Sequence, residues 1–192
     1  YNYLRELRGE DLPFEEPVAV AVNSKDEIFV LDATLQWIYG YHAEGNFKGR
    51  FAGPEARLFF PRGLTIFEDD TLAVADTGGG RIVFFSPDGV LANSMGTVGI
   101  GPGQFIEPTD VLRDQQSTYF VVEAENDRLQ RLDRAGTPLG QRPIPPAYAY
   151  DGPHMAFAPD GTLLMTESQS SSLLRYGPSE TLLDQWQNLE TV

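Results

Sequence analysis

The sequence repeats itself about every 45 residues, and this periodicity constrains the fold more than any other feature. Four prolines that each precede a short apolar run are separated by 44, 47 and 45 residues: Pro17, Pro61, Pro108 and Pro153. Fourteen or fifteen residues after each proline, a second apolar run ends on an acid, at Asp32, Asp76, Glu123 and Glu167. A third landmark follows thirteen residues later, at Gly45, Gly89, Gly136 and, in the fourth unit, Glu180. Three landmarks in phase indicate four structural units.

Each unit consists of short runs rich in Val, Ile, Phe and Tyr, bounded by Gly, Pro, Asp and Asn, which is typical of β-strands. No apolar stripe at helical spacing extends over three turns. The run that ends on the acid is almost continuously apolar, as in IFVLD and LAVAD, which indicates a strand covered on both faces. Four short antiparallel strands in about 45 residues predict one blade of an all-β propeller, which becomes stable by stacking on its neighbours.

The second and third units resemble the NHL repeat. The resemblance rests on the run LAVADTG at 72–78 with RIVFF at 81–85, and on VVEAENDRL at 121–129. It extends over about 14–186 and is looser in the first and fourth units, where Trp37 and Ser172 stand near the position of the family's arginine. The resemblance implies a propeller, usually of six blades. It does not imply one function, because such propellers serve as binding modules, scaffolds and occasionally enzymes.

We expect a single propeller domain or propeller segment over 1–192, with repeats at about 14–58, 59–104, 105–149 and 150–186. Residues 1–8 are expected to form the outer strand of a preceding or closing blade. The fourth unit already has its own last strand near 181–186, so an arc of a larger propeller is favoured over a compact four-blade ring. An open arc would expose sheet faces that further blades or a partner chain must cover.

Charge and composition restrict the partners. The net charge of −14 disfavours nucleic acid and anionic membrane surfaces. No apolar run is long enough to cross a bilayer, so no membrane insertion is expected. The absence of cysteine excludes disulfides, thiolate metal sites and a cysteine nucleophile. The chain starts at Tyr1 without a signal-like segment, which suggests a mature form or a fragment, and we favour an extracytoplasmic location.

The four repeat acids occur once per blade and therefore lie on one rim. They could hold a hard cation such as Ca²⁺, or each could accept backbone hydrogen bonds from the loop just after it. Their recurrence in every unit and the NHL resemblance favour the structural role, so we expect no metal and no cofactor. His42 and His154 lack paired-ligand spacing and are expected on a surface strand and facing the central channel.

We expect a non-catalytic binding or scaffold module that presents its loops to a protein or glycan partner, or to other subunits of an assembly. No nucleophile motif occurs, and the glycine-rich stretch 96–103 lacks the Lys-Ser/Thr of a phosphate loop. Aromatic and arginine side chains are favoured contact residues. The candidates for partner contact are Tyr41, Arg57, Phe59, Phe60, Tyr148 and Tyr150.

The alternative is an enzyme similar to the six-blade lactonase or lyase propellers, which hold a divalent metal on the axis. The candidate ligands would lie at the starts of the first strands, at Glu16, Asp110, Asp151 and His154. Enzymes of this type need ligands from a full ring, and four units are visible in the sequence. The binding role is therefore favoured.

Overall fold

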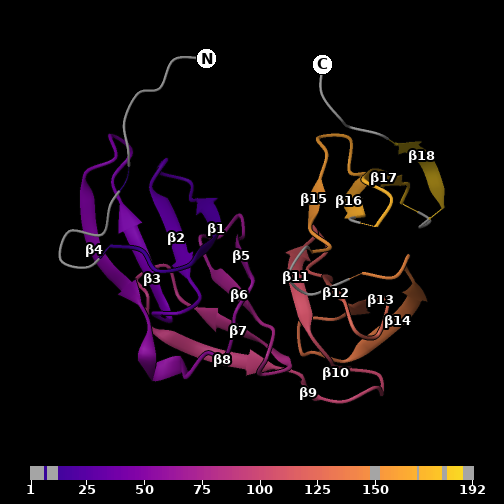
Figure 1. Cartoon of the computed structure of the whole chain (residues 1–192), viewed down its shortest axis with the longest axis horizontal. Coiled ribbons are helices and arrows are strands. Elements are labelled where there is room, and N and C mark those ends of the chain that lie inside the picture. The colour runs from indigo at the N-terminus through magenta and orange to yellow at the C-terminus, as the bar shows by residue number, and fades with distance from the viewer. Residues whose placement is uncertain (1–6, 8–12, 148–151, 168, 179–180, 188–192) are drawn as a thin grey trace.

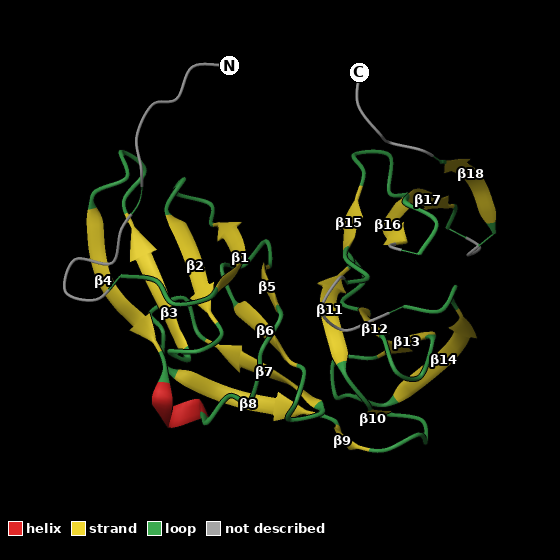
Figure 2. Ribbon diagram, in the orientation of Figure 1, coloured by secondary structure: helices red, strands yellow, loops and turns green. Residues whose placement is uncertain are grey.

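In the computed structural model, polar turns reverse the chain within each repeat and the apolar runs pair as antiparallel strands (Figures 1 and 2). The structure describes Leu7 and residues 13–147, 152–167, 169–178 and 181–187. These described residues form four four-stranded sheets, each with its strands in sequence order. The sheets fan about a shared centre as the blades of a propeller (Figure 1). The all-β propeller predicted from the repeat is therefore confirmed.

Each blade begins with an inner strand near the shared centre and ends with an outer strand. The first two blades contain β1 (Pro17–Val22), β2 (Ile28–Asp32), β3 (Trp37–Tyr41), β4 (Phe47–Ala52), β5 (Gly63–Ile66), β6 (Leu72–Asp76), β7 (Arg81–Phe85) and β8 (Leu91–Met95). The last two contain β11 (Pro108–Arg113), β12 (Tyr119–Glu123), β13 (Arg128–Leu132), β14 (Pro138–Pro143), β15 (Met155–Phe157), β16 (Leu163–Glu167), β17 (Ser172–Tyr176) and β18 (Leu182–Trp186).

Two connectors carry short elements that the sequence analysis did not predict. A 3₁₀ turn, η1 (Pro54–Ala56), leads from the first blade to the second. The glycine-rich connector between the second and third blades forms a small parallel pair, β9 (Thr97–Val98) and β10 (Gln104–Phe105). Neither element resembles a membrane-spanning segment, and the part of the chain that the structure describes contains no helix long and apolar enough to cross a bilayer.

Consecutive blades are held together by apolar clusters between their faces. Phe29 and Leu31 of the first blade share one cluster with Val74 and Phe85 of the second. A second cluster joins the second and third blades, and a third joins the third and fourth. Burial of apolar surface at about 25 cal/mol per Å² makes these shared faces the main source of stability. The described residues thus contain three inter-blade clusters for four blades.

The first and fourth blades differ in how the sheet face that points away from the neighbouring blade, here called the outer face, is covered. Inner strand β1 packs on β5, β5 on β11 and β11 on β15, whereas no comparable contact joins β15 to β1 among the described strands. The outer face of the first blade is covered in part by Phe14, which packs on the buried rings of Tyr39 and Tyr41. In the fourth blade, Thr166 of β16 is exposed. All five residues of β6, the equivalent strand in the second blade, are buried.

The strand predicted at 1–8 lies outside the described residues except for Leu7. That side chain packs against the cluster on the outer face of the first blade.

Candidate functional site

The four repeat acids are buried at the ends of the second strands. Asp32, Asp76 and Glu123 are 0% exposed and Glu167 is 7% exposed. A carboxylate removed from water is tolerated only where hydrogen bonds or ion pairs replace its hydration. Each of these carboxylates accepts several hydrogen bonds from its own blade. The acids therefore organise the loops at this end of the strands.

One set of donors comes from the connector that enters the blade. The amide of Phe59 donates to Asp76 Oδ1 at 2.5 Å. The amide of Ile106 donates in the same way to Glu123 Oε2 at 3.0 Å. Both connector residues lie seventeen positions before the acid that holds them. The acids thus fix the connectors between the blades.

A second set of donors comes from the loop after the acid. Within the described residues these donors are backbone amides in the first and fourth blades and the side chain of Asn126 in the third, whose Nδ2 donates to Glu123 Oε2 at 2.6 Å. The amide of Leu35 donates to Asp32 at 2.9 Å, and the amide of Gln169 donates to Glu167 at 2.8 Å. In these two blades the acid therefore closes the turn that follows it.

Arginines replace the loop amides in the second and third blades. Arg81 Nε lies 2.7 Å from Asp76 Oδ2, and Arg128 Nε lies 2.6 Å from Glu123 Oε1. These buried or half-buried ion pairs neutralise the two acids. Among the described residues, no three His, Asp or Glu side chains are grouped so that they could hold a metal ion.

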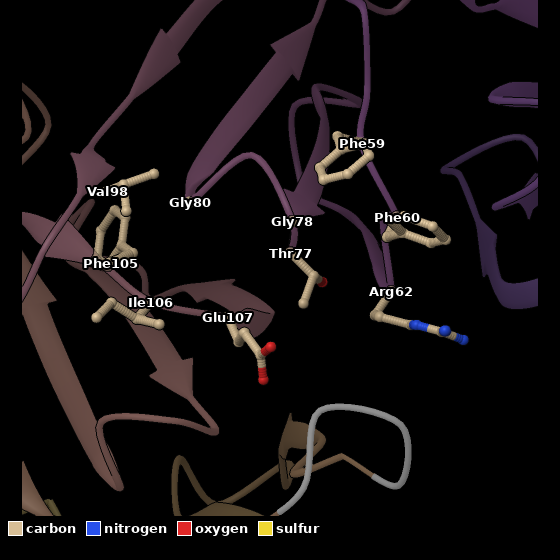
Figure 3. Close-up of a pocket in the computed structure, with 10 residues that line it drawn as sticks. All are labelled: Phe59, Phe60, Arg62, Thr77, Gly78, Gly80, Val98, Phe105, Ile106 and Glu107. Carbon is tan, nitrogen blue, oxygen red and sulfur yellow. The ribbon is translucent and has the colours of Figure 1, made fainter.

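The connectors held by these acids form a pocket of about 390 Å³ between the second and third blades (Figure 3). Figure 3 shows the two phenylalanines on one side of the pocket and the apolar side chains of the next connector on the other. The lining residues are Phe59, Phe60, Arg62, Thr77, Gly78, Gly80, Val98, Phe105, Ile106 and Glu107.

Much of the wall is apolar, and three of its large apolar side chains are exposed to solvent. The rings of Phe59 and Phe60 meet edge to face, with their centroids 4.7 Å apart, and the two residues are 55% and 53% exposed. Val98, on the opposite wall, is 65% exposed. Contiguous exposed apolar side chains are typical of interaction surfaces.

Two glycines lie so close to lining residues that a side chain would not fit there. A Cβ atom at Gly78 would lie 2.5 Å from Cδ1 of Phe59 and 2.8 Å from its carbonyl oxygen. At Gly80, which has a φ of +59°, a Cβ atom would lie 2.6 Å from Cγ2 of Val98. The small-residue loop after the second strand therefore leaves room for the side chains that line the pocket.

Two lining residues have strained backbones. Phe60 and Glu107 have φ angles of 48° and 51°, although each carries a side chain and immediately precedes a proline. This left-handed conformation costs about 1–2 kcal/mol per residue outside glycine. It is retained because the surroundings determine it; the amide of Ala124, for example, donates to the Glu107 carbonyl at 3.0 Å. Such strain often accompanies a functional surface.

The charged and polar side chains at the pocket differ in whether they have hydrogen-bond or ion-pair partners. Arg62 Nη1 lies 3.0 Å from Glu16 Oε1, and the side chain of Arg62 is only 11% exposed. The Thr77 hydroxyl donates to the carbonyl of Pro108 at 2.8 Å. The carboxylate of Glu107, by contrast, has no hydrogen bond or ion pair within the described residues. In Figure 3 it is drawn below Thr77, on the side away from Phe59 and Phe60.

Only some of the residues predicted to contact a partner line the pocket. Phe59 and Phe60 line the pocket. Arg57 is exposed at the end of η1 and does not line it. Tyr41 is corrected: its side chain is 1% exposed, and burial raises its pKa to about 12, so it belongs to the core of the first blade. Tyr148 and Tyr150 lie outside the described residues.

Arg62, Val98, Ile106 and Glu107 line this site but were not among the residues predicted from the sequence. A usable signal was present, since Phe60 and Glu107 both directly precede a repeat proline. Comparing this position between repeats would have selected both residues. Val98 had no such signal, because it comes from the β9–β10 pair, which the repeat does not predict.

The residues predicted as ligands of a catalytic metal are only partly brought together in the structure. Asp110 is 6% exposed; it accepts the amide of Met155 at 2.7 Å, and burial raises its pKa to about 6. The nearby charge of His154 opposes this shift. Glu16 is engaged by Arg62, and Asp151 lies outside the described residues. The described candidates therefore do not fit a metal centre, and Asp110 acts as a link between the third and fourth blades.

A larger pocket of about 630 Å³ lies between the third and fourth blades, at the opposite ends of the strands. Two of its charged residues already have partners. Arg113 Nη2 lies 2.9 Å from Asp69 Oδ1, and Arg175 Nη2 lies 2.5 Å from Asp160 Oδ2. Its lining also includes the polar residues Glu68, Gln115 and Gln116.

Comparison with solved structures identifies β-propeller proteins. A catalytically inactive virginiamycin B lyase from Staphylococcus aureus with quinupristin superposes with a TM-score of 0.71 at 16% identity, over 97% of this chain and 60% of the lyase. A streptogramin B lyase gives 0.69 at 16% identity, over 96% and 58% of the two chains. A chain of a nidogen/laminin complex gives 0.70 at 19% identity, over 93% and 65%.

This chain thus spans about three fifths of the length of the lyases that it matches. No family model and no curated protein matches it. At these identities the likeness establishes the fold, and the similar structures include both a lyase and a chain from a protein complex.

Proposed function

We propose that this chain is a non-catalytic binding module of the NHL-repeat type that engages a protein partner through the pocket between its second and third blades. The observation that carries the proposal is the pair Phe59 and Phe60, each more than half exposed beside an apolar pocket. Aromatic side chains that fit a partner's pocket or ridge supply much of the binding energy at protein interfaces. A similar propeller chain from a complex of nidogen with laminin supports a protein as the partner.

A glycan is the less favoured ligand. Sugar hydroxyls need many hydrogen-bonding groups, and this pocket offers few that are unoccupied, because Arg62 is paired with Glu16 and the Thr77 hydroxyl is bonded to Pro108. A mainly apolar wall with one available carboxylate suits a peptide side chain better. The partner could be a separate protein or another subunit of the same assembly.

The test compares two variants that differ in whether they touch the pocket. Phe60→Asn removes a pocket ring, and Leu139→Asn removes a side chain of equal exposure, 53%, from the outer strand β14. The tagged chain is cross-linked in its native host and the captured material is quantified. We expect the wild type and Leu139→Asn to capture the same protein, and Phe60→Asn to lose it.

Equal capture by Phe60→Asn would reject the proposed function. Capture that a glycosidase abolishes would assign a glycan instead. The expected extracytoplasmic location remains a prediction, which fractionation of native cells would check.

The second candidate, a lactonase-like or lyase-like enzyme, is favoured by one observation, the buried Asp110 beside His154. Carboxyls with a raised pKa often occur at catalytic sites. To test this candidate, turnover of lactones and streptogramins is measured for the wild type, with Asp110→Asn as the inactive control. Turnover that Asp110→Asn abolishes would favour the enzyme over the binding module.

A further inference from the structure

We infer that the larger pocket, of about 630 Å³ between the third and fourth blades, is a second binding site and that its ligand is a neutral oligosaccharide. The site lies at the other end of the strands from the pocket of Phe59 and Phe60, so the inference goes beyond the proposed function. It depends on three properties of the larger pocket: an aromatic wall, polar side chains without a partner among the described residues, and turns that hold the wall in place.

The aromatic wall consists of Phe120 of the third blade and Phe157 of the fourth, which both line the pocket. Their rings meet edge to face with the centroids 5.4 Å apart, and both side chains are only partly buried. The face of an aromatic ring is negative, and the C–H groups of a sugar ring carry a small positive charge, so the two attract each other. The aromatic wall therefore suits the apolar face of a sugar.

The polar side chains are those of Glu68, Gln115 and Gln116, which lie on turns of the second and third blades. All three residues are exposed, and their side chains form no hydrogen bond or ion pair with another residue in the part of the chain that the structure describes. A side-chain amide both donates and accepts hydrogen bonds, and a carboxylate accepts them. Since a hydroxyl also donates and accepts, the hydroxyls of a sugar find complementary groups here.

The charges at this pocket favour a neutral ligand. The guanidinium of Arg113 is paired with Asp69 at 2.9 Å and lies over the ring of Phe67, 4.4 Å from its centroid, so it is already engaged. The carboxylate of Glu68 and the net charge of −14 repel an anionic sugar. A cationic ligand gains little from Glu68, because an ion pair at an exposed turn contributes little to binding.

The turns that carry the wall are closed by their own hydrogen bonds. The carboxylate of Asp114 accepts the amides of Gln116 at 2.9 Å and Thr118 at 2.8 Å. The carboxylate of Asp160 accepts the amide of Thr162 at 3.0 Å in the corresponding turn of the fourth blade. A wall that is ordered before binding loses less conformational entropy when the ligand arrives. The pocket volume also lies within the range of small-molecule sites, roughly 300–1,000 Å³.

The experiment applies a dilution series of the fluorescently labelled chain to an array of immobilised neutral, sialylated and sulfated oligosaccharides. We expect binding to neutral oligosaccharides and none to the sialylated or sulfated forms. Gln115→Ala combined with Gln116→Ala should weaken the binding by about tenfold, since hydrogen bonds to the sugar are lost. Phe157→Leu keeps an apolar side chain without the ring and should also weaken it. Gln169→Ala makes the same change as the glutamine variant at an exposed turn outside the pocket and should leave the binding unchanged.

The outcomes separate this inference from the proposed function. Binding to no neutral oligosaccharide, or equal binding by the wild type and the double glutamine variant, overturns the inference. A preference for the sulfated or sialylated forms overturns the choice of a neutral ligand. Phe60→Asn, which should lose the protein partner, should bind the sugar as tightly as the wild type. If Phe60→Asn loses the sugar and the glutamine variant retains it, the sugar binds at the smaller pocket and the inference is wrong.

Discussion

The backbone amide of Phe59 donates a 2.5 Å hydrogen bond to the buried carboxylate of Asp76, which follows it by seventeen residues. The same carboxylate receives Arg81 Nε at 2.7 Å. The repeat acid therefore does two things: it neutralises an arginine, and it fixes the connector that carries the aromatic wall of the pocket. A residue that defines the fold also determines the shape of the candidate site.

Replacement of Asp76 by Asn should destabilise the chain and loosen Phe59. An amide cannot accept from both Phe59 and Arg81 without turning its own NH₂ group toward a donor. We expect the free energy of unfolding to fall by roughly 2–3 kcal/mol. Urea denaturation measures the loss, and faster exchange of the Phe59 amide would show the local effect. Glu44→Gln, at an exposed turn, should change stability by less than about 0.5 kcal/mol.

Phe60→Asn should separate binding from stability. Asparagine tolerates positive φ better than phenylalanine, so it relieves strain at a position with a φ of 48°. Because the Phe60 side chain is 53% exposed, its removal loses little buried surface. We expect unfolding free energy within about 1 kcal/mol of the wild type, or above it. A loss well beyond that value in urea denaturation would assign Phe60 to the core rather than to a binding surface.

Gly78→Ala should close part of the pocket. The new Cβ atom would lie 2.8 Å from the carbonyl oxygen of Phe59, which the backbone cannot easily move. We expect a cost of about 1–3 kcal/mol and a displaced Phe59 ring. Gly40→Ala is the matched control, because its Cβ atom would make its nearest contact at 3.6 Å. If thermal melts and spectra of the two variants agree, the close packing of Phe59 on Gly78 is refuted.

Asp110 should make stability depend on pH. Burial raises its pKa to about 6 from an ordinary value of 3.8, so the folded state binds this proton more tightly than the unfolded state. The stabilisation from protonated Asp110 is complete below about pH 4 and is lost as the pH rises through about 6. Between pH 3 and 8 the wild type should lose roughly 3 kcal/mol relative to Asp110→Asn.

The comparison is best made in a His154→Gln background, since the charge of His154 opposes the shift at Asp110. Urea denaturation at several pH values measures the effect. Parallel pH curves for the two chains would contradict it.

The repeat was sufficient to predict the blades because each blade follows local rules. Polar turns reverse the chain, and a continuously apolar second strand must be covered on both faces, as the fully buried β6 demonstrates. The site was less predictable. Phe59 and Phe60 were selected as exposed aromatics, but the repeat landmarks did not reveal that the acids hold connectors seventeen residues upstream.

Two other features depend on contacts outside the repeat. Tyr41 was expected at the surface, yet it is buried, because Phe14 and Phe47 pack on the outer face of the first blade. The β9–β10 pair arises within a glycine-rich connector that has no strand signal. The 45-residue repeat predicts only the features that all four units share. The burial of Tyr41 and the β9–β10 pair each occur in a single unit.

The sheets differ in how many neighbouring sheets they share an apolar cluster with, and this difference implies an order of unfolding. A middle sheet shares apolar clusters with neighbours on both sides, whereas the described part of the fourth sheet shares only the cluster with the third. Local opening should therefore begin in β15–β18, where protease cleavage and amide exchange would first be seen, and spread backwards along the chain. A molecule that binds over Leu164 and Thr166 should slow the opening of this sheet.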